Sequence, residues 1–321
     1  MDTPVAMIVF NRPDHTRAVV DALLDAGPDR VYVIADGPRP GHPTDADRCD
    51  RVRETVERLG ERSELVRVYS DANLGCRERV VSGLDGVFAR EERCVILEDD
   101  CVPHPSFFRF CAELLERYAA DERVMSVSGD SLQNALGGMT FGADYFFTRY
   151  CHVWGWATWR RAWRHNAGIL ERWPRLKREG LLRERLDTLH ERVFWTDWLD
   201  RCADGRLNTW DVPWTLAMWE AGGLSISPSK NLVRNIGMDA QGTHHTEDSE
   251  LGNLPANEMR FPLRHPGSVE RHAEADRWAD RHLYSGSPRD RYKRLYRGWK
   301  KRVRGRVRGL LGRARAPGRA G

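Results

Sequence analysis

The sequence predicts an α/β fold in which a mostly parallel central sheet is flanked by helices. The first observation is that short apolar runs alternate, through residues 1–130, with longer segments whose apolar residues recur at helical spacing. The second is that turn-forming residues close the runs, as Asp36-Gly37-Pro38 does. The third is size: 321 residues, 40% of them hydrophobic, suffice for a buried core, which excludes disordered and collagen-like chains.

Each expected element of the first half has its own pattern. Val5–Phe10 is a continuous apolar run, typical of a buried strand, and His15–Ala26 has apolar residues at 18, 19, 22, 23 and 26, which is helical spacing. Thr44–Leu59 is largely polar and is expected to be an exposed helix. The other expected strands are Val31–Ala35, Leu65–Tyr69, Cys94–Leu97 and Val124–Val127, and the other helices are Cys76–Phe88 and Pro105–Tyr118.

The second half has a different composition. Ten of the twelve tryptophans lie between Trp154 and Trp219. The segment Gln241–Arg271 is polar and rich in Pro, Gly, Asn and His, so we expect a long loop or lid.

Composition also predicts a compartment. The seven cysteines form no CxxC pair, which favours reduced thiols over a disulfide framework. No apolar run approaches the roughly 18 residues of a membrane span, and the N-terminal residues lack the pattern of a secretory signal. We therefore expect a cytoplasmic protein.

Acidic residues stand at a predicted strand end. In an open α/β sheet, ligands bind beyond the carboxyl ends of the strands. Glu98, Asp99 and Asp100 directly follow the apolar run Cys94–Leu97, and three adjacent carboxylates repel one another unless a cation lies between them. The pattern predicts a Mg²⁺ or Mn²⁺ site that holds a substrate phosphate.

Two other strand ends carry polar side chains. Arg12 follows the first strand and could clamp a phosphate, whereas Asp36 follows the second and could accept from a base or ribose. Neither a phosphate-binding P-loop motif nor Gly-x-Gly-x-x-Gly occurs, so the familiar ATPase and dinucleotide-binding modes are excluded. A metal-held nucleotide diphosphate remains as the ligand class.

Several motifs in order resemble those of GT-A-fold nucleotide-diphosphosugar transferases, in particular bacterial enzymes related to N-acetylglucosaminyltransferase I. The match spans roughly residues 4–245, and each motif is weak alone while their order is specific. The matching stretches are PVAMIVFNRP at 4–13, NLGC at 73–76, ILEDDCVP at 96–103, GWATWRRAW at 155–163, WP at 173–174, FWTDW at 194–198 and NLVRNIG at 231–237.

The resemblance implies roles for individual residues. Glu98-Asp99-Asp100 corresponds to the family's DxD motif, with Asp100 as the direct metal ligand and Asp99 as a ribose or metal-shell contact. Arg12 corresponds to the arginine that meets the diphosphate, and Asp36 to the acid that reads the base. The nucleotide-sugar contacts are completed by Glu98, Asn11 and Asn73, and a further metal ligand or diphosphate contact by His244, or by its neighbour His245.

Inverting sugar transfer also needs a carboxylate that takes the acceptor's proton. Two candidates are flanked by tryptophans, Asp197 in FWTDW and Asp211 in WDVPW. By resemblance, Asp197 matches the base of the N-acetylglucosaminyltransferase I group, whereas Asp211 lies in a pattern typical of the bacterial relatives. Aromatic faces suit sugar rings, so we expect an acceptor platform of Trp154, Trp156, Trp210 and Trp214.

The C-terminal segment is strongly basic. Residues 287–321 contain 14 Arg or Lys and one Asp, so that the rest of the chain carries −9 of a total net charge of +4. Its apolar residues, including Trp299, recur at helical spacing, which predicts an amphipathic helix on an anionic membrane surface. A disordered tail and a nucleic-acid-binding tail are the alternatives for such a run.

Together these patterns predict a metal-dependent, inverting glycosyltransferase that moves a sugar from UDP to a glycan or lipid-linked acceptor in surface polysaccharide synthesis, at the inner membrane face. The alternatives are a sugar-phosphate nucleotidyltransferase and an inactive sugar- or nucleotide-binding protein. The expected regions are a nucleotide-sugar-binding half at 1–130, an acceptor-binding half at 131–245, a loop or lid at 246–286 and the basic tail at 287–321.

Overall fold

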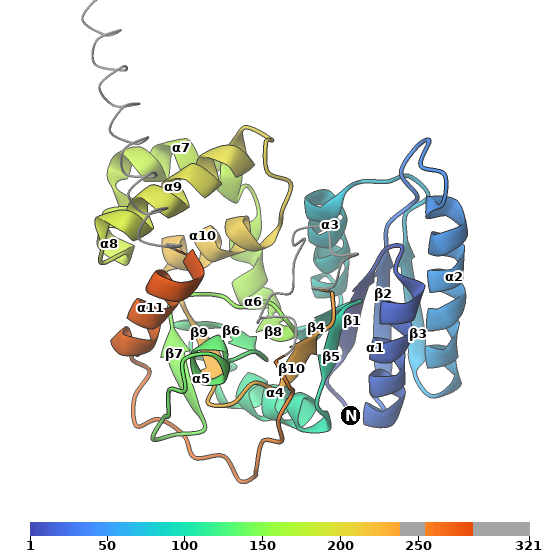
Figure 1. Cartoon of the computed structure of the whole chain (residues 1–321), viewed down its shortest axis with the longest axis horizontal. Helices are drawn as coiled ribbons and strands as arrows, with labels where there is room; N and C mark the ends of the chain where they lie inside the picture. The colour runs from blue at the N-terminus through green and yellow to red at the C-terminus, as the bar shows by residue number, and fades with distance from the viewer. Residues whose placement is uncertain (238–253, 285–321) are drawn as a thin grey trace, which may run out of the picture.

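An eight-stranded mixed sheet forms the centre of the protein (Figure 1). The computed structural model describes residues 1–237 and 254–284. The strand order is β3-β2-β1-β4-β8-β6-β9-β7. The strands span Val5–Val9 (β1), Arg30–Ala35 (β2), Glu64–Tyr69 (β3), Arg93–Glu98 (β4), Val124–Ser128 (β6), Tyr145–Thr148 (β7), Trp156–Trp159 (β8) and Leu224–Pro228 (β9).

Strands β1 to β4 form the parallel half of this sheet. Strand β1 pairs in parallel with β2 and β4, and β2 with β3. Side chains alternate between the faces of a strand, so Val5 and Met7 enter one hydrophobic core while Ala6 enters the other. Apolar residues on both faces explain why these strands read as continuous apolar runs.

The other half inserts antiparallel strands. Strand β8 runs antiparallel between β4 and β6, with Trp156 opposite Ile96 on one side and Ser128 on the other. Strand β9 is parallel to β6, and the edge strand β7 is antiparallel to β9. As a result, β4 and β6 point the same way, and their carboxyl ends lie at the same edge of the sheet.

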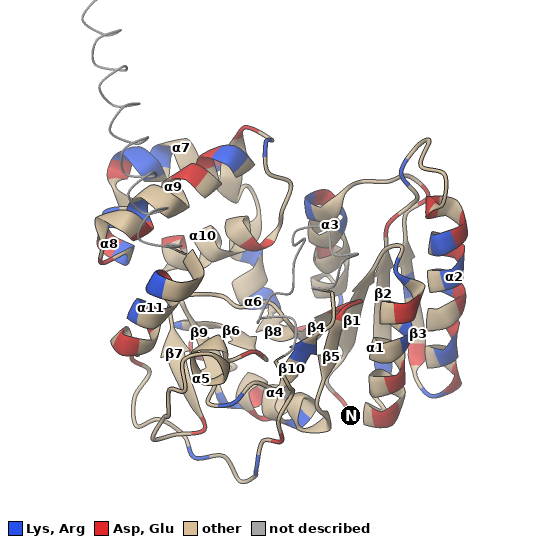
Figure 2. Ribbon diagram, viewed as in Figure 1, with Lys and Arg blue, Asp and Glu red and all other residues tan. Residues whose placement is uncertain are grey.

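Helices cover both faces of the sheet. Residues of α1, α2 and α4 pack in one core, whereas α3 and the helices between α6 and α10 pack in the other. Figure 1 shows α7, α8 and α9 grouped together, and Figure 2 shows charges of both signs interspersed along α2 and α7. The helices span Pro13–Ala26 (α1), Asp45–Glu57 (α2), Cys76–Phe88 (α3), Pro105–Arg117 (α4), Leu132–Ala135 (α5), Arg160–Trp163 (α6), Ile169–Glu179 (α7), Leu181–Arg185 (α8), Leu189–Ala203 (α9), Asp211–Ala221 (α10) and Ala273–Ala279 (α11).

A short ribbon connects the two halves at the acidic strand end. Strand β5 (Cys101–Pro103) pairs antiparallel with β10 (Val233–Asn235). The amide of Ile236 donates to the carbonyl of Asp100 at 2.8 Å. A Cβ atom on Gly237 would lie 2.1 Å from Asp100 Oδ2, so only glycine fits against this carboxylate.

The α/β fold class is confirmed, with each predicted element of the first half within a few residues of its bounds. The region 246–286 is not wholly a loop, because α11 and a π-helical turn over Asp280–Tyr284 lie within it. All seven cysteines are free. In the part of the chain that the structure describes, no helix is long and apolar enough to span a bilayer. The basic tail and His244 lie outside this part.

Candidate active site

Arg12 joins the ends of β1 and β4. Its guanidinium donates to Asp99 Oδ1 at 2.5 Å and to Asp100 Oδ2 at 3.0 Å. The backbone N–H of Phe10 also donates to Asp99 Oδ2, at 3.4 Å. The pairing of β1 with β4 therefore brings together two strand-end motifs that are more than 80 residues apart in sequence.

Burial and charge are opposed in this cluster. Burial lowers the pKa of Arg12, but the charges of Asp99, Asp100 and Glu98 outweigh it and raise that pKa above its ordinary value. Burial, with repulsion from the neighbouring acids, raises the pKa of Glu98 to about 8 and that of Asp99 to about 6. With all groups charged, three acids and one arginine carry a formal charge of −2, which one divalent cation would neutralise.

Asp211 lies beside this cluster. Trp210 donates its indole N–H to Glu98 Oε1 at 3.1 Å, and Asp211 is the next residue, at the start of α10. Asp211 Oδ1 accepts from the Thr209 hydroxyl, and the carboxylate is partly exposed. Burial, with smaller contributions from the charges of Glu98 and Asp211, raises the pKa of the Cys76 thiol to about 12.

Asp197 occupies a different environment. It is exposed on α9, whose buried side carries Phe194, Trp195 and Leu199. Its charge acts on Arg206, in the connection between α9 and α10. Of the two predicted base candidates, the structure brings Asp211 to the acidic strand end, whereas no described contact links Asp197 to it.

Asp36 is engaged with the protein. Its carboxylate accepts from the backbone N–H groups of Gly37, Leu74 and Gly75, each at 2.9 Å. Asn73 donates to Asp36 Oδ2 at 3.2 Å and to the carbonyl of Gly37 at 2.8 Å. These contacts hold the ends of β2 and β3 together, and the roles of Asp36 and Asn73 toward a nucleotide stay predictions.

Asn11 has a similar positioning role. Its amide donates to Asp45 Oδ1 at 2.8 Å, and Asp45 also pairs with Arg39 at 2.6 Å. Asp45 is fully buried at the start of α2. The chain around Arg39 is thereby fixed next to the end of β1.

The predicted acceptor platform is wrong for most of its tryptophans. Trp156 and Trp214 are 0% exposed and Trp210 is 3% exposed. Trp156 stacks on Trp210 with ring centroids 5.3 Å apart, and Trp214 packs against both Trp156 and Trp163. These indoles form the core beneath α10, and only Trp154, which is partly exposed, retains a surface for a ligand.

The described residues supply few metal ligands. In residues 1–237 and 254–284, no group of three or more His, Cys, Asp or Glu is arranged to hold a metal ion. Asp99 and Asp100 offer hard carboxylate oxygens, and Asp100 Oδ1 contacts only the Cys101 thiol, at 3.4 Å. One or two carboxylates fit the way Mg²⁺ is bound when substrate phosphates complete its shell. His244, the other predicted ligand, lies outside these residues.

One buried polar pair includes Asp130, which the sequence analysis did not single out. Asp130 follows the end of β6, and its Oδ2 lies 3.7 Å from His152 Nδ1. Among the described residues, Asp130 Oδ1 and His152 Nε2 are buried without a hydrogen-bond partner, which costs about 1–3 kcal/mol for each group. The strand-end rule, had it been applied to Val124–Ser128 as it was to the first four strands, would have indicated Asp130.

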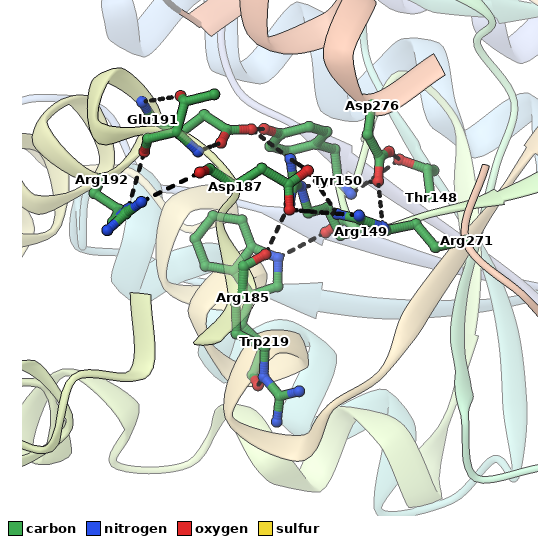
Figure 3. A network of polar contacts seen from close by, with 11 residues as sticks. Thr148, Arg149, Tyr150, Arg185, Asp187, Glu191, Arg192, Trp219, Arg271 and Asp276 are labelled. Atoms are coloured by element: carbon green, nitrogen blue, oxygen red, sulfur yellow. Dashed lines mark hydrogen bonds and ion pairs between the residues drawn. The ribbon is translucent and has the colours of Figure 1, made fainter. Parts of the chain in front are cut away.

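Arg149, which follows β7, belongs to a buried ion network (Figure 3). Its guanidinium bonds Glu191 and lies 3.3 Å from Asp187 and 3.7 Å from Asp276. Arg271 pairs with the same two aspartates, and Tyr150 donates to Glu191 at 2.8 Å. The network ties the end of β7 to α9 and α11, which is a structural role.

Comparison with known proteins yields a limited likeness. No family model and no curated protein matches the chain. A structure of UDP-glucose pyrophosphorylase complexed with UDP-glucose aligns over 47% of this chain and 64% of its own, with 8% identity and a TM-score of 0.26. An apo-UDP-glucose pyrophosphorylase aligns over 71% and 90%, with 9% identity and a TM-score of 0.36. The chain thus spans less than two thirds of the first of these enzymes.

The Arg149 network yields a stability prediction. Arg149→Met should lower the free energy of unfolding by about 3–5 kcal/mol, because it leaves the buried Glu191 carboxylate without a counter-charge. Arg164→Met is the matched control, since Arg164 is 64% exposed and lies 3.9 Å from Glu122. It should cost less than about 1 kcal/mol. Urea unfolding measures both, and equal losses in the two variants would contradict the structural role.

Proposed function

We propose that this protein is a metal-dependent, inverting glycosyltransferase of the GT-A type that transfers a sugar from UDP to a glycan or lipid-linked acceptor. The observation that carries the proposal is that Arg12 holds Asp99 and Asp100 at one edge of the sheet, where Trp210, the residue before the separate carboxylate Asp211, bonds Glu98. A diphosphate needs cationic groups, and an acceptor hydroxyl needs a base. The candidate site offers both within one neighbourhood.

The residues divide the work by their chemistry. Arg12 can bind phosphate oxygens with its two terminal nitrogens, which now hold Asp99 and Asp100. Asp211 has one oxygen bonded to Thr209, which orients the carboxylate, while the other oxygen can take the proton of the acceptor hydroxyl. Trp210 fixes Glu98 and the start of α10, so that the base and the acidic cluster keep their relative positions.

A divalent ion fits this proposal. Asp100, with Asp99, would hold Mn²⁺ or Mg²⁺, and His244 is the further ligand that the resemblance implies. Bound there, the ion would neutralise charge on the departing diphosphate. Arg12 already neutralises part of the negative charge of Asp99 and Asp100. This limits how tightly the metal ion would bind before a nucleotide is present.

The metal proposal predicts a variant-specific loss of ligand stabilisation. Mn²⁺ with UDP should raise the unfolding temperature of the wild-type chain, because ligands that bind only the folded state stabilise it by about 2.7 kcal/mol at 100 times Kd. Asp100→Asn should remove most of this shift. Asp71→Asn, at an exposed carboxylate beyond β3, is the matched control and should keep it. An undiminished shift in Asp100→Asn would contradict the role of the acidic cluster.

Product analysis separates the competing functions. A glycosyltransferase releases UDP from a UDP-sugar when an acceptor or water is present. A nucleotidyltransferase instead consumes pyrophosphate with the UDP-sugar and forms UTP. Nucleotide binding without either product would favour the inactive binding protein.

The choice of base gives a kinetic prediction. Asp211→Asn should lower kcat by about 10²- to 10⁴-fold with little change in UDP-sugar affinity, as expected for removal of a general base. Asp197→Asn, the same substitution on the exposed side of α9, should stay near wild-type turnover. Single-turnover kinetics with the best UDP-sugar measures both. The opposite pattern would assign the base to Asp197.

We also propose that the basic tail attaches the enzyme to an anionic membrane surface. Its 14 basic residues provide about 1 kcal/mol each near such a surface. A chain ending at Tyr284 should lose co-sedimentation with anionic vesicles, while the full chain should bind them and not neutral vesicles. Equal sedimentation of the two chains would reject this attachment.

A further inference from the structure

The buried pair of Asp130 and His152 lies at the same edge of the sheet as the acidic cluster. Trp156 pairs with Ile96 of β4 and with Ser128 of β6, and Glu98 and Asp130 each follow two residues later. Strand β8 lies between β4 and β6, so Glu98 and Asp130 are two strand spacings apart, which is about 10 Å. The backbone N–H of Gly129 donates to the carbonyl of Gly155 at 2.7 Å, which joins the segment after β6 to the segment before β8.

The pair and the proposed base influence the same two buried groups. Burial, with smaller contributions from the charges of Asp130 and Asp211, raises the pKa of the Cys151 thiol to about 12. The same two carboxylates act on the Tyr284 phenol, whose pKa burial raises well above its ordinary value.

The pair has capacity for hydrogen bonds that the protein does not use. Asp130 is 1% exposed and His152 is 6% exposed, yet Asp130 Oδ1 and His152 Nε2 have no partner among the described residues. Two further side chains of the segment after β6, Ser131 and Gln133, also have unpartnered buried atoms. By contrast, most buried polar atoms in proteins are hydrogen-bonded.

We propose that Asp130 and His152 bind hydroxyl groups of the sugar that the nucleotide carries. This inference rests on the proposed function. A hydroxyl donates and accepts at once, so it can bond a carboxyl oxygen and an imidazole nitrogen together. Burial raises the pKa of Asp130 to about 8 and lowers that of His152 to about 4, so both are largely neutral at pH 7. A neutral polar pair suits an uncharged sugar and is a poor match for a diphosphate.

Tyr284 covers this pair. Its ring is nearly parallel to that of His152, with an interplanar angle of 16° and centroids 6.5 Å apart, and lies 4.6 Å from the Tyr150 ring. His152 is 6% exposed, and we infer that a sugar reaches it when the neighbouring ring of Tyr284 moves. The pair is then a subsite that the π-helical turn over Asp280–Tyr284 covers.

The test compares the affinities of UDP and UDP-sugars. Isothermal titration with Mn²⁺ measures UDP, UDP-glucose, UDP-galactose and UDP-N-acetylglucosamine on the full chain. His152→Phe keeps a ring of similar shape and removes both nitrogens. We expect it to weaken the tightest UDP-sugar about 5- to 10-fold, as loss of one or two hydrogen bonds should, with UDP changed less than about two-fold. His165→Phe, a partly buried histidine in the same half, is the matched control and should change neither.

The affinities of UDP and of the UDP-sugars decide whether the sugar subsite exists. Unchanged UDP-sugar affinity in His152→Phe, or an equal loss for UDP, would overturn the sugar subsite. Wild-type affinities that are equal for UDP and all the UDP-sugars would also overturn it and leave the proposed function standing. No nucleotide binding by the wild-type chain would reject the proposed function itself, and this inference with it.

Two further variants guard against misfolding. Asp130→Asn is nearly isosteric and changes the unpartnered oxygen to a donor, so it too should weaken the UDP-sugar selectively. Tyr284→Ala removes the covering ring and should leave the UDP-sugar affinity equal or higher. A loss in Tyr284→Ala as large as in His152→Phe would show that the pair and its covering ring are a structural unit, which contradicts the proposal.

Discussion

The ion pairs of Arg12 with Asp99 and Asp100 are the constraint on which the candidate site depends. Burial, together with the mutual repulsion of three acids at the end of one strand, raises the pKa of Glu98 and of Asp99. Arg12 stands between the end of β1 and the start of α1, and β1 pairs with β4. Its positive charge therefore lies beside the three acids and reduces their repulsion. The balance is incomplete, and the proposed cation site rests on the negative charge that remains.

Hydrophobic packing determines where the second half meets this cluster. Trp156 belongs to β8, which lies between β4 and β6, and its indole stacks on Trp210. Trp210 in turn bonds Glu98, and Asp211 follows it at the start of α10. Burial of large indoles, which is worth several kcal/mol, thus positions two acids that come from distant parts of the chain. The tryptophans serve the site from within the core.

The sequence predicted those features that depend on local spacing and failed on those that depend on distant pairing. Strands such as Val5–Val9 and helices such as Pro13–Ala26 follow from apolar periodicity, and the position of Arg12 and the acids at strand ends follows from the rule for parallel sheets. The antiparallel strand β8 lies between β4 and β6 because of pairing between distant segments, and such pairing produces no periodic pattern in the sequence. A tryptophan-rich sequence is compatible both with a sugar-binding surface and with a hydrophobic core. The two are distinguished by the burial of the indoles in the folded protein.

The two buried polar clusters of the second half differ in a way that separates structure from binding. In the network of Figure 3, each carboxylate lies within 4.0 Å of a guanidinium, so its charges are compensated within the protein. Arg149 Nε and Asp276 Oδ2 of this network lack a hydrogen-bond partner among the described residues, yet they lie 3.7 Å apart as an ion pair. The Asp130 and His152 pair has no guanidinium within 4.0 Å in the part of the chain that the structure describes, and one atom of each side chain has no hydrogen-bond partner there. A cluster whose charges are compensated contributes to the fold, because removing one member leaves a buried charge. The Asp130 and His152 pair lacks this compensation, and the sugar proposed above would supply the missing hydrogen bonds.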